Sequence, residues 1–271
     1  MLGRFDLLVS PGEAPKLLEY NADTPTLLLE ASVVQADWAK HHGVEQFNEV
    51  DKLLLASWPK CLERTARAWG RTLASLEQVL FSAHRTSIEE ADNIDYLEST
   101  ARYAGLATIS CDIDHVRVAS RGSVEVASLS SPGGDAPAAP AEAVRSMWKL
   151  YPYEWLVEEE LGAALEHDVF TRNALDASGG GCVWMEPPWK LILSNKALLP
   201  LLWAMFPNHP NLLAAFFTAG EASAHEVSVR QKERYWGEYG WVAKPKYGRE
   251  GVGILYSFDF PDMDAFDQQV C

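Results

Sequence analysis

The feature that most constrains this fold is an alternation of strand-like and helix-like segments between residues 77 and 119. Short apolar runs at 77–83, 106–110 and 115–119 predict strands, and the longer pattern at 88–104 predicts a helix. Strands and helices that alternate in this way are typical of α/β architectures. We therefore expect an α/β (α+β) fold.

The first 70 residues predict a β-hairpin followed by two helices. Residues 2–9 and 15–21 have strand character, and the Ser-Pro-Gly-Glu break at 10–13 has strong turn chemistry. Apolar residues at helical spacing then predict one helix over 27–38 and a second within 45–70.

The second half of the chain is less regular. Two segments lack an apolar pattern: 128–141, rich in Pro, Gly, Ala and Ser, predicts a linker, and 220–240 is polar. The remaining patterns predict helices over 142–167, a strand at 182–185, a helix at 197–206, and strands at 241–244 and 254–258.

Composition excludes several classes of function. The chain carries 23 basic and 38 acidic residues, a formal net charge of −15, and such a field repels nucleic-acid phosphates. It could favour a cationic substrate such as a polyamine, or simply serve solubility. Apolar stretches such as 197–206 are shorter than the ~20 residues that cross a bilayer. With no apolar signal segment and four widely spaced cysteines, we expect a cytoplasmic protein.

The predicted hairpin carries the first candidate site. Arg4 and Asp6 share one face of its first strand, and Glu19 and Asn21 share one face of the second. If the strands pair, two carboxylates, an amide oxygen and a guanidinium converge. Such hard oxygen ligands suit Mg²⁺, which shares phosphate oxygens with a nucleotide, and Arg4 suits phosphoryl charge. The alternative is an ordinary cross-strand salt bridge on an exposed face.

Two further motifs could contact phosphate. Lys244 ends a predicted strand and precedes Gly248, Gly251 and Gly253, whose backbone N–H groups could approach phosphate oxygens; a plain hairpin turn is the alternative. Lys196 precedes the apolar helix, where it could be a second phosphate- or adenine-binding cation or only a surface lysine. The adjacent histidines His41 and His42 lack a third metal ligand at convincing spacing, so we expect them to be solvent-exposed residues at a helix end.

Five sequence blocks together carry a family resemblance. They are GRFDLL, KLLEYNADTPTLLLEASVVQADW, MWKLYPYEW, WMEPPWKLILSNKALLPLLWAMFPNHPNLL and WVAKPKYGREGVGI, which cover most of the chain in order. They resemble the glutathionylspermidine synthase family, which has an ATP-grasp-type synthetase fold. The resemblance implies ATP- and Mg²⁺-dependent ligation of a peptide carboxylate to an amine, possibly a polyamine, through an acyl phosphate.

The resemblance also implies roles for individual residues. Asp6, Glu19 and Asn21 match the family's Mg²⁺ ligands, and Arg4 matches the arginine that stabilises the transferring phosphoryl group. Lys196 and Lys244 match two ATP-contacting lysines, and Thr24 falls near the peptide substrate. Residues 246–253 match the glycine-rich flap over the phosphates, which includes Gly248, Arg249, Gly251 and Gly253.

Three departures from the family pattern qualify these expectations. No segment corresponds to an amidase domain, and Leu150 stands where the glutathione-using enzymes have a hydroxyl residue. The match begins and ends inside the family's length, so we expect a fold that is incomplete at the C-terminus and a tendency to self-associate. We expect a substrate- and metal-binding domain at 1–180 and part of a nucleotide-binding domain at 181–271. The alternative function is an inactive nucleotide- or partner-binding paralogue.

Overall fold

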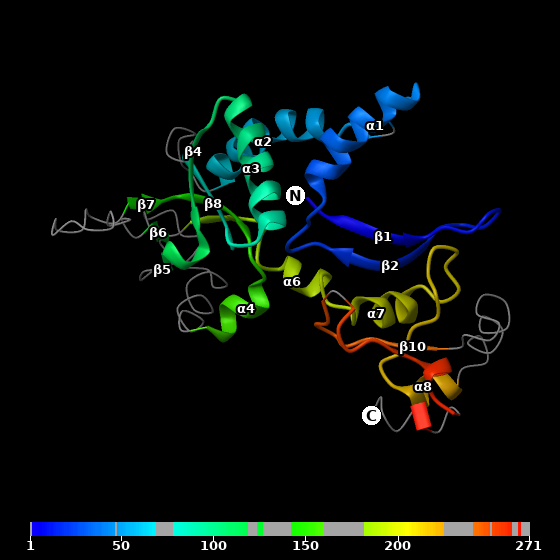
Figure 1. Cartoon of the computed structure of the whole chain (residues 1–271). Coiled ribbons are helices and arrows are strands. Elements are labelled where there is room, and N and C mark those ends of the chain that lie inside the picture. Colours follow the sequence, from blue (N-terminus) through cyan, green and yellow to red (C-terminus); the bar gives the residue numbers. More distant parts are fainter. Residues whose placement is uncertain are drawn as a thin grey trace. The chain divides into compact units, whose positions relative to one another are not determined.

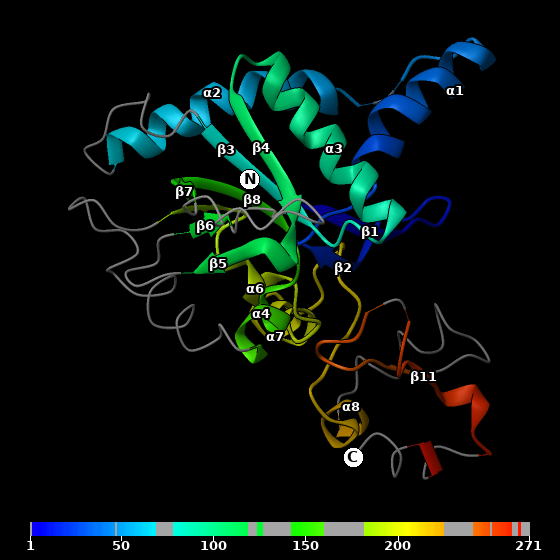
Figure 2. The same cartoon turned by 60° about the vertical axis from the view of Figure 1, so that its left-hand side comes forward.

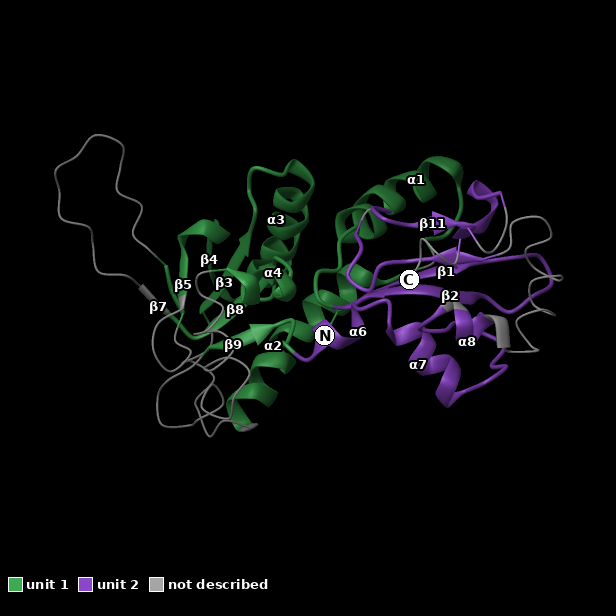
Figure 3. Cartoon of the chain, turned by 90° about the horizontal axis from the view of Figure 1, so that it is seen from below, with its two compact units in different colours: residues 1–2, 23–188 green, residues 3–22, 189–271 purple. Residues whose placement is uncertain are grey.

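The computed structural model describes residues 2–46, 48–68, 78–118, 124–126, 142–159, 182–224, 241–249, 251–261 and 265–266. The expected linker at 128–141 and most of the polar segment at 220–240 lie outside these residues. The chain divides into two compact units, one formed by residues 1–2 and 23–188 and the other by 3–22 and 189–271 (Figure 3). The hairpin thus groups with the C-terminal part, whereas the expected division at 180/181 puts it in the first domain.

The first unit is built on a four-stranded parallel sheet (Figures 1 and 2). Its strand order is β4-β3-β8-β9, and each neighbouring pair is parallel. The elements are β3 (Gln78–Ala83), α3 (Ile88–Tyr103), β4 (Ala107–Asp112), β8 (Ser146–Leu150) and β9 (Val183–Met185). The α/β expectation is confirmed, including the strand–helix–strand alternation from which it was drawn.

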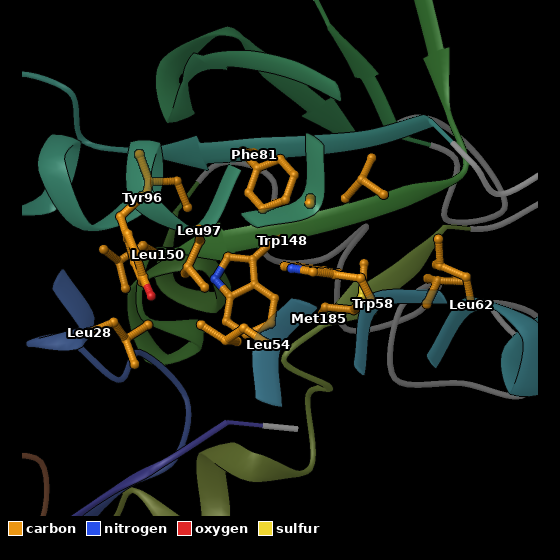
Figure 4. Packing of buried hydrophobic residues seen from close by; sticks show 14 of the residues in the cluster. Leu28, Leu54, Trp58, Leu62, Phe81, Tyr96, Leu97, Trp148, Leu150 and Met185 are labelled. Atoms are coloured by element: carbon orange, nitrogen blue, oxygen red, sulfur yellow. The ribbon is translucent and has the colours of Figure 1, made fainter. Parts of the chain in front are cut away.

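Two long helices cover one face of this sheet with an aromatic core. α2 (Val50–Ala68) and α3 pack against alternate residues of β3 and β8. Trp58 of α2 lies edge-on to both Phe81 and Trp148, with ring centroids 5.6 and 5.7 Å apart (Figure 4). Its indole N–H donates to Thr100 Oγ1 at 2.8 Å, so the polar end of this buried ring is satisfied.

The helix predicted at 27–38 is longer and less regular than expected. A π-helical segment, η1 (Glu30–Val34), leads into α1 (Gln35–His42), which ends at Gly43 in the left-handed conformation. Leu28 packs into the core, and its N–H donates to Asn93 Oδ1 on α3 at 3.0 Å. The start of this helix is therefore fixed by contacts with α3.

The prediction of helix from residue 142 is wrong for 142–150. These residues form β7 (Glu142–Val144) and β8, and only α4 (Tyr153–Glu158) is helical; residues 160–167 lie outside the described part. All five residues of β8 are buried, so both faces of this strand are covered. A strand buried on both faces loses the alternation that identifies strands in sequence.

A small antiparallel sheet lies in the same unit. It is formed by β5 (Val116–Val118), β6 (Val124–Val126) and β7, and the 3₁₀ helix η3 (Ile113–His115) precedes it.

Lys149, the fourth residue of β8, forms a fully buried ion pair. Its Nζ lies 2.7 Å from Asp23 Oδ1, and both side chains have no solvent exposure. The Nζ also donates to Tyr151 O at 2.6 Å and lies 3.5 Å from the centre of the Tyr153 ring. Asp23 accepts the Tyr153 backbone N–H at 2.8 Å. The pair therefore fixes the chain directly after the hairpin into the first unit.

The second unit combines the N-terminal hairpin with short C-terminal elements. Its elements are β1 (Arg4–Leu8), β2 (Lys16–Asn21), α6 (Lys190–Leu193), α7 (Leu198–Met205), α8 (Ala219–Ala224), β10 (Val242–Ala243), β11 (Leu255–Tyr256) and the 3₁₀ helix η7 (Ser257–Asp259). The hairpin prediction and the strand pair near 241–258 are confirmed. The hairpin joins this unit because the Leu17 N–H donates to Asn211 O at 2.9 Å and Lys16 Nζ donates to Pro210 O.

None of the helices in the described ranges has the length and apolar character needed to span a bilayer.

Candidate functional site

The candidate site begins on the hairpin, where the antiparallel register brings four polar residues into two pairs. Arg4 lies opposite Asn21, and Asp6 lies opposite Glu19. The register shifts between Asp6 and Leu7. The two pairs lie before this irregularity, in regular register with each other. The alternation predicted from sequence therefore gives one polar face that carries two carboxylates, an amide and a guanidinium.

Arg4 organises this face through its own strand and the neighbouring one. Its Nε lies 3.0 Å from Asp6 Oδ1, on the same strand. Its Nη2 donates to the Asn21 amide oxygen at 2.7 Å when the amide nitrogen donates to Glu19 Oε1 at 3.1 Å. In the opposite orientation of the amide, the Asn21 oxygen would face Glu19 Oε1. Two hydrogen-bond acceptors lie this close only when a cation binds both.

Lys196 links the hairpin to the loop that follows β10. Its Nζ lies 3.1 Å from Glu19 Oε2, and its side chain is only 10% exposed. The same Nζ donates to Gly248 O at 2.5 Å, and the Lys196 backbone N–H donates to Lys246 O at 2.9 Å. The surface-lysine alternative is therefore wrong, because Lys196 lies between a carboxylate and the loop.

Lys244 lies at the end of β10 and faces the same charges. Burial lowers the pKa of Lys244 below its ordinary 10.5, and Lys196 adds to this effect, while Glu19 and Asp6 oppose it. Lys244 is thus within electrostatic range of the hairpin carboxylates and of the second lysine. The structure therefore brings Asp6, Glu19, Lys196 and Lys244 together in one compact unit.

The glycine-rich loop has the backbone that its sequence requires. Gly251 and Gly253 have φ of +78° and +72°, in the left-handed region that favours glycine. A Cβ on Gly253 would lie 2.9 Å from Pro245 Cγ. The Gly248 N–H donates to Pro245 O at 3.2 Å, which closes a turn directly after Lys244.

The donor set of this cluster fits a metal–polyphosphate pair. Carboxylate and amide oxygens are the ligands that Mg²⁺ takes from proteins. The cluster has three cationic side chains and two carboxylates, so it carries one net positive charge, which suits an anionic ligand. The cations are Arg4, Lys196 and Lys244. Ion pairs are present on this face as well: Arg4 pairs with Asp6 on its own strand, and Lys196 reaches Glu19 from another element. The metal site therefore stays a prediction.

Two singled-out positions lie in the first unit. Thr24 is half-buried and directly follows the buried Asp23. Leu150 is 3% exposed and packs in the core between the sheet and helices α2 and α3. Ser194, two residues before Lys196, has a structural role that the sequence does not show: its Oγ accepts the Ala22 N–H at 3.0 Å and so holds the end of β2.

Comparison with protein families identifies the family of this chain. The family described as glutathionylspermidine synthase preATP-grasp matches residues 1–264. The chain belongs to the glutathionylspermidine synthase family. The resemblance drawn from the five sequence blocks is thereby confirmed, as is a fold of this α/β family.

Individual relatives share most of this chain but extend beyond it. A Haemophilus influenzae protein named as a candidate acid–amine ligase is 33% identical over 94% of this chain and 55% of its own length. The glutathionylspermidine synthase of Crithidia fasciculata is 27% identical over 94% of this chain and 34% of its own length. The bifunctional glutathionylspermidine synthetase/amidase of Escherichia coli is 24% identical over 93% of this chain and 37% of its own length. This member of the family thus spans between a third and about half of these relatives.

Proposed function

We propose that the chain provides the metal and phosphate site of an ATP- and Mg²⁺-dependent carboxylate–amine ligase. One observation carries the proposal: the oxygen ligands of the hairpin share a compact unit, and a network of charges, with Lys196, Lys244 and the glycine-rich loop. Membership of a ligase family supports the same reaction class.

In this proposal the hairpin holds the metal. Asp6, Glu19 and Asn21 would supply its oxygen ligands. Mg²⁺ held by these residues would supply charge neutralisation for the polyphosphate. Arg4 contacts the transferring phosphoryl group, and Asp6 holds the guanidinium in place by the contact at 3.0 Å.

The two lysines and the loop act on the nucleotide. Lys196 and Lys244 neutralise phosphate oxygens, and binding frees Lys196 from Gly248 and Glu19. Backbone N–H groups of residues 246–253, which include Gly248, Arg249, Gly251 and Gly253, cover the phosphates and exclude water. Exclusion of water matters because an acyl phosphate hydrolyses readily.

The reaction proceeds in two displacements. A substrate carboxylate oxygen attacks the γ-phosphorus of ATP, and ADP leaves. The amine nitrogen then attacks the acyl carbon and loses a proton as inorganic phosphate leaves, so that an amide forms. Because the protein forms no covalent bond, positioning and charge neutralisation supply the acceleration.

The proposed substrates are a peptide or small-molecule carboxylate and an amine, with a polyamine as the first amine to try. Relatives named for glutathionylspermidine and trypanothione synthesis support this class. Thr24 is the proposed contact to the acyl substrate. A cytoplasmic location, with small molecules rather than nucleic acid or membrane as partners, completes the proposal.

Release of ADP by the 271-residue chain, with Mg²⁺ and a panel of carboxylates and amines, tests the proposal. Hydroxylamine in the same mixture traps an acyl phosphate as a hydroxamate, which separates the first displacement from the second. We expect Asp6→Ala and Lys244→Ala to lower the rate by about 100-fold or more. The matched control is Lys52→Ala, a charge removed from an exposed helix surface in the first unit.

The outcomes distinguish the proposal from its alternative. Nucleotide binding without turnover of any substrate pair would favour the binding paralogue. ADP release that both site variants retain would reject the assignment of Asp6 and Lys244.

A further inference from the structure

A second group of reactive side chains lies in the first unit, at the carboxyl-terminal edge of the parallel sheet. His84 directly follows β3, Asp112 ends β4, and Asp114 lies in η3 just beyond it. The two strands are neighbours, with Ala83 opposite Asp112. In α/β sheets, ligands bind beyond the carboxyl ends of the strands.

The three side chains are close enough to share one ion. One ligand atom from each of His84, Asp112 and Asp114 lies within 4.8 Å of the other two. Zn²⁺ binds imidazole nitrogen and carboxylate oxygen at about 2.0–2.2 Å, so small side-chain rotations bring all three donors to it. We propose that His84, Asp112 and Asp114 form a Zn²⁺ site, with the remaining coordination positions taken by water.

The protein already orients one of these ligands. Asp112 Oδ2 accepts the Arg85 backbone N–H at 2.9 Å, and Oδ1 accepts the Asp114 backbone N–H at 3.1 Å. Hydrogen bonds of this kind hold metal-binding carboxylates in position and leave further lone pairs for the metal. The loop after β3 and the turn after β4 thus converge on Asp112.

The imidazole supplies the observation that points to a ligand outside the chain. His84 Nδ1 is buried and has no hydrogen-bond partner among the described residues, whereas buried polar atoms in native proteins almost always have one. The ring lies edge-on to Tyr151, with centroids 5.8 Å apart, and the His84 backbone N–H donates to Glu90 Oε2 at 3.2 Å. These contacts hold the backbone and one ring edge but do not satisfy Nδ1.

The surrounding charges favour a cation. The guanidinium of Arg85 donates to both carboxylate oxygens of Asp95 at 2.7 and 3.0 Å and to Ser110 Oγ at 2.9 Å, so its charge is paired outside the cluster. Glu90 adds a negative charge beside His84. His115 is the other titratable neighbour of Asp112. An imidazole ligand selects a transition ion over Mg²⁺, which separates this site from the oxygen ligands of the hairpin.

Metal titration of the full chain tests the site. The chelator-stripped protein is titrated with Zn²⁺ against a chromophoric chelator, and with Co²⁺ for the absorption bands that report nitrogen ligation. We expect one tight ion per chain, a Zn²⁺-dependent rise in unfolding temperature, and about 100-fold or greater weakening in His84→Gln, since loss of a residue that merely supports a ligand already costs ~10–100-fold.

The matched control and a second variant make the result decisive. His41→Gln with His42→Gln removes two exposed histidines on α1 and should leave Zn²⁺ affinity unchanged. Asp114→Asn changes an exposed side chain, so it tests the site if His84→Gln fails to fold. Zn²⁺ affinity that survives Asp114→Asn, or that is lost in the α1 control, would overturn the proposal.

Discussion

Replacing Lys149 by methionine removes the cation from a buried ion pair and is expected to destabilise the first unit strongly. The Asp23 carboxylate would stay buried at zero exposure after losing the lysine at 2.7 Å, although the hydrogen bond from the Tyr153 N–H remains. Breaking a buried pair in this way lowers the free energy of unfolding by about 3–5 kcal/mol. For a unit of this size that corresponds to roughly 10 °C in unfolding temperature.

Denaturant and thermal unfolding, followed by tryptophan fluorescence and circular dichroism, measure this effect. Combining Lys149→Met with Asp23→Asn should recover part of the loss, because the second substitution removes the charge that Lys149→Met leaves unpaired. Lys52→Met breaks a solvent-exposed pair of the same chemistry with Glu49 and should leave the unfolding temperature unchanged. The reasoning fails if Lys149→Met behaves like this control, or if the double variant is no more stable than the single one.

Three further predictions follow from single residues. Burial lowers the pKa of the free Lys244 ammonium below 10.5, and a bound phosphate would raise this pKa again. At a pH between the two pKa values, Lys244 is neutral in the free protein and protonated in the complex, so nucleotide binding should take up a proton. The uptake should grow as the pH rises from neutral toward the lowered pKa. Calorimetry in buffers of different ionisation enthalpy measures the uptake, which Lys244→Met should abolish. Gly253→Ala should weaken nucleotide binding, since a Cβ there would strain the backbone and meet Pro245; Gly43→Ala, with a similar φ of +66° and open space, should not change the Kd. Burial raises the pKa of the Cys182 thiol, so a thiol reagent should modify Cys182 only at the rate of unfolding, as mass spectrometry would show.

The sequence predicted the hairpin well because its physics is local. Alternating side chains and a Pro-Gly turn predict the two strands and the shared faces of Arg4 with Asp6 and of Glu19 with Asn21. The register, which pairs Arg4 with Asn21 and Asp6 with Glu19, comes from the structure. The roles of these residues, by contrast, came from family resemblance, because spacing alone does not distinguish a metal site from an ion pair.

The errors and omissions depend on long-range packing. β8 was predicted as helix because both of its faces are buried, and Lys149 gave no signal until Asp23, 126 residues away, was seen to pair with it. The His84 cluster is not visible in the sequence for the same reason, since β3 and β4 bring His84 to Asp112 only when they pair. The grouping of the hairpin with the C-terminal elements likewise depends on the contact of Leu17 with Asn211.

Equilibrium binding of ATP to the 271-residue chain, with Mg²⁺ and with a chelator, tests the central claim most directly. The account predicts that Mg²⁺ tightens ATP binding in the parent chain and that Asp6→Asn removes this gain without unfolding the protein. Lys244→Met should weaken binding under both conditions. ATP affinity that does not depend on Mg²⁺, or a full Mg²⁺ gain in Asp6→Asn, would contradict the account.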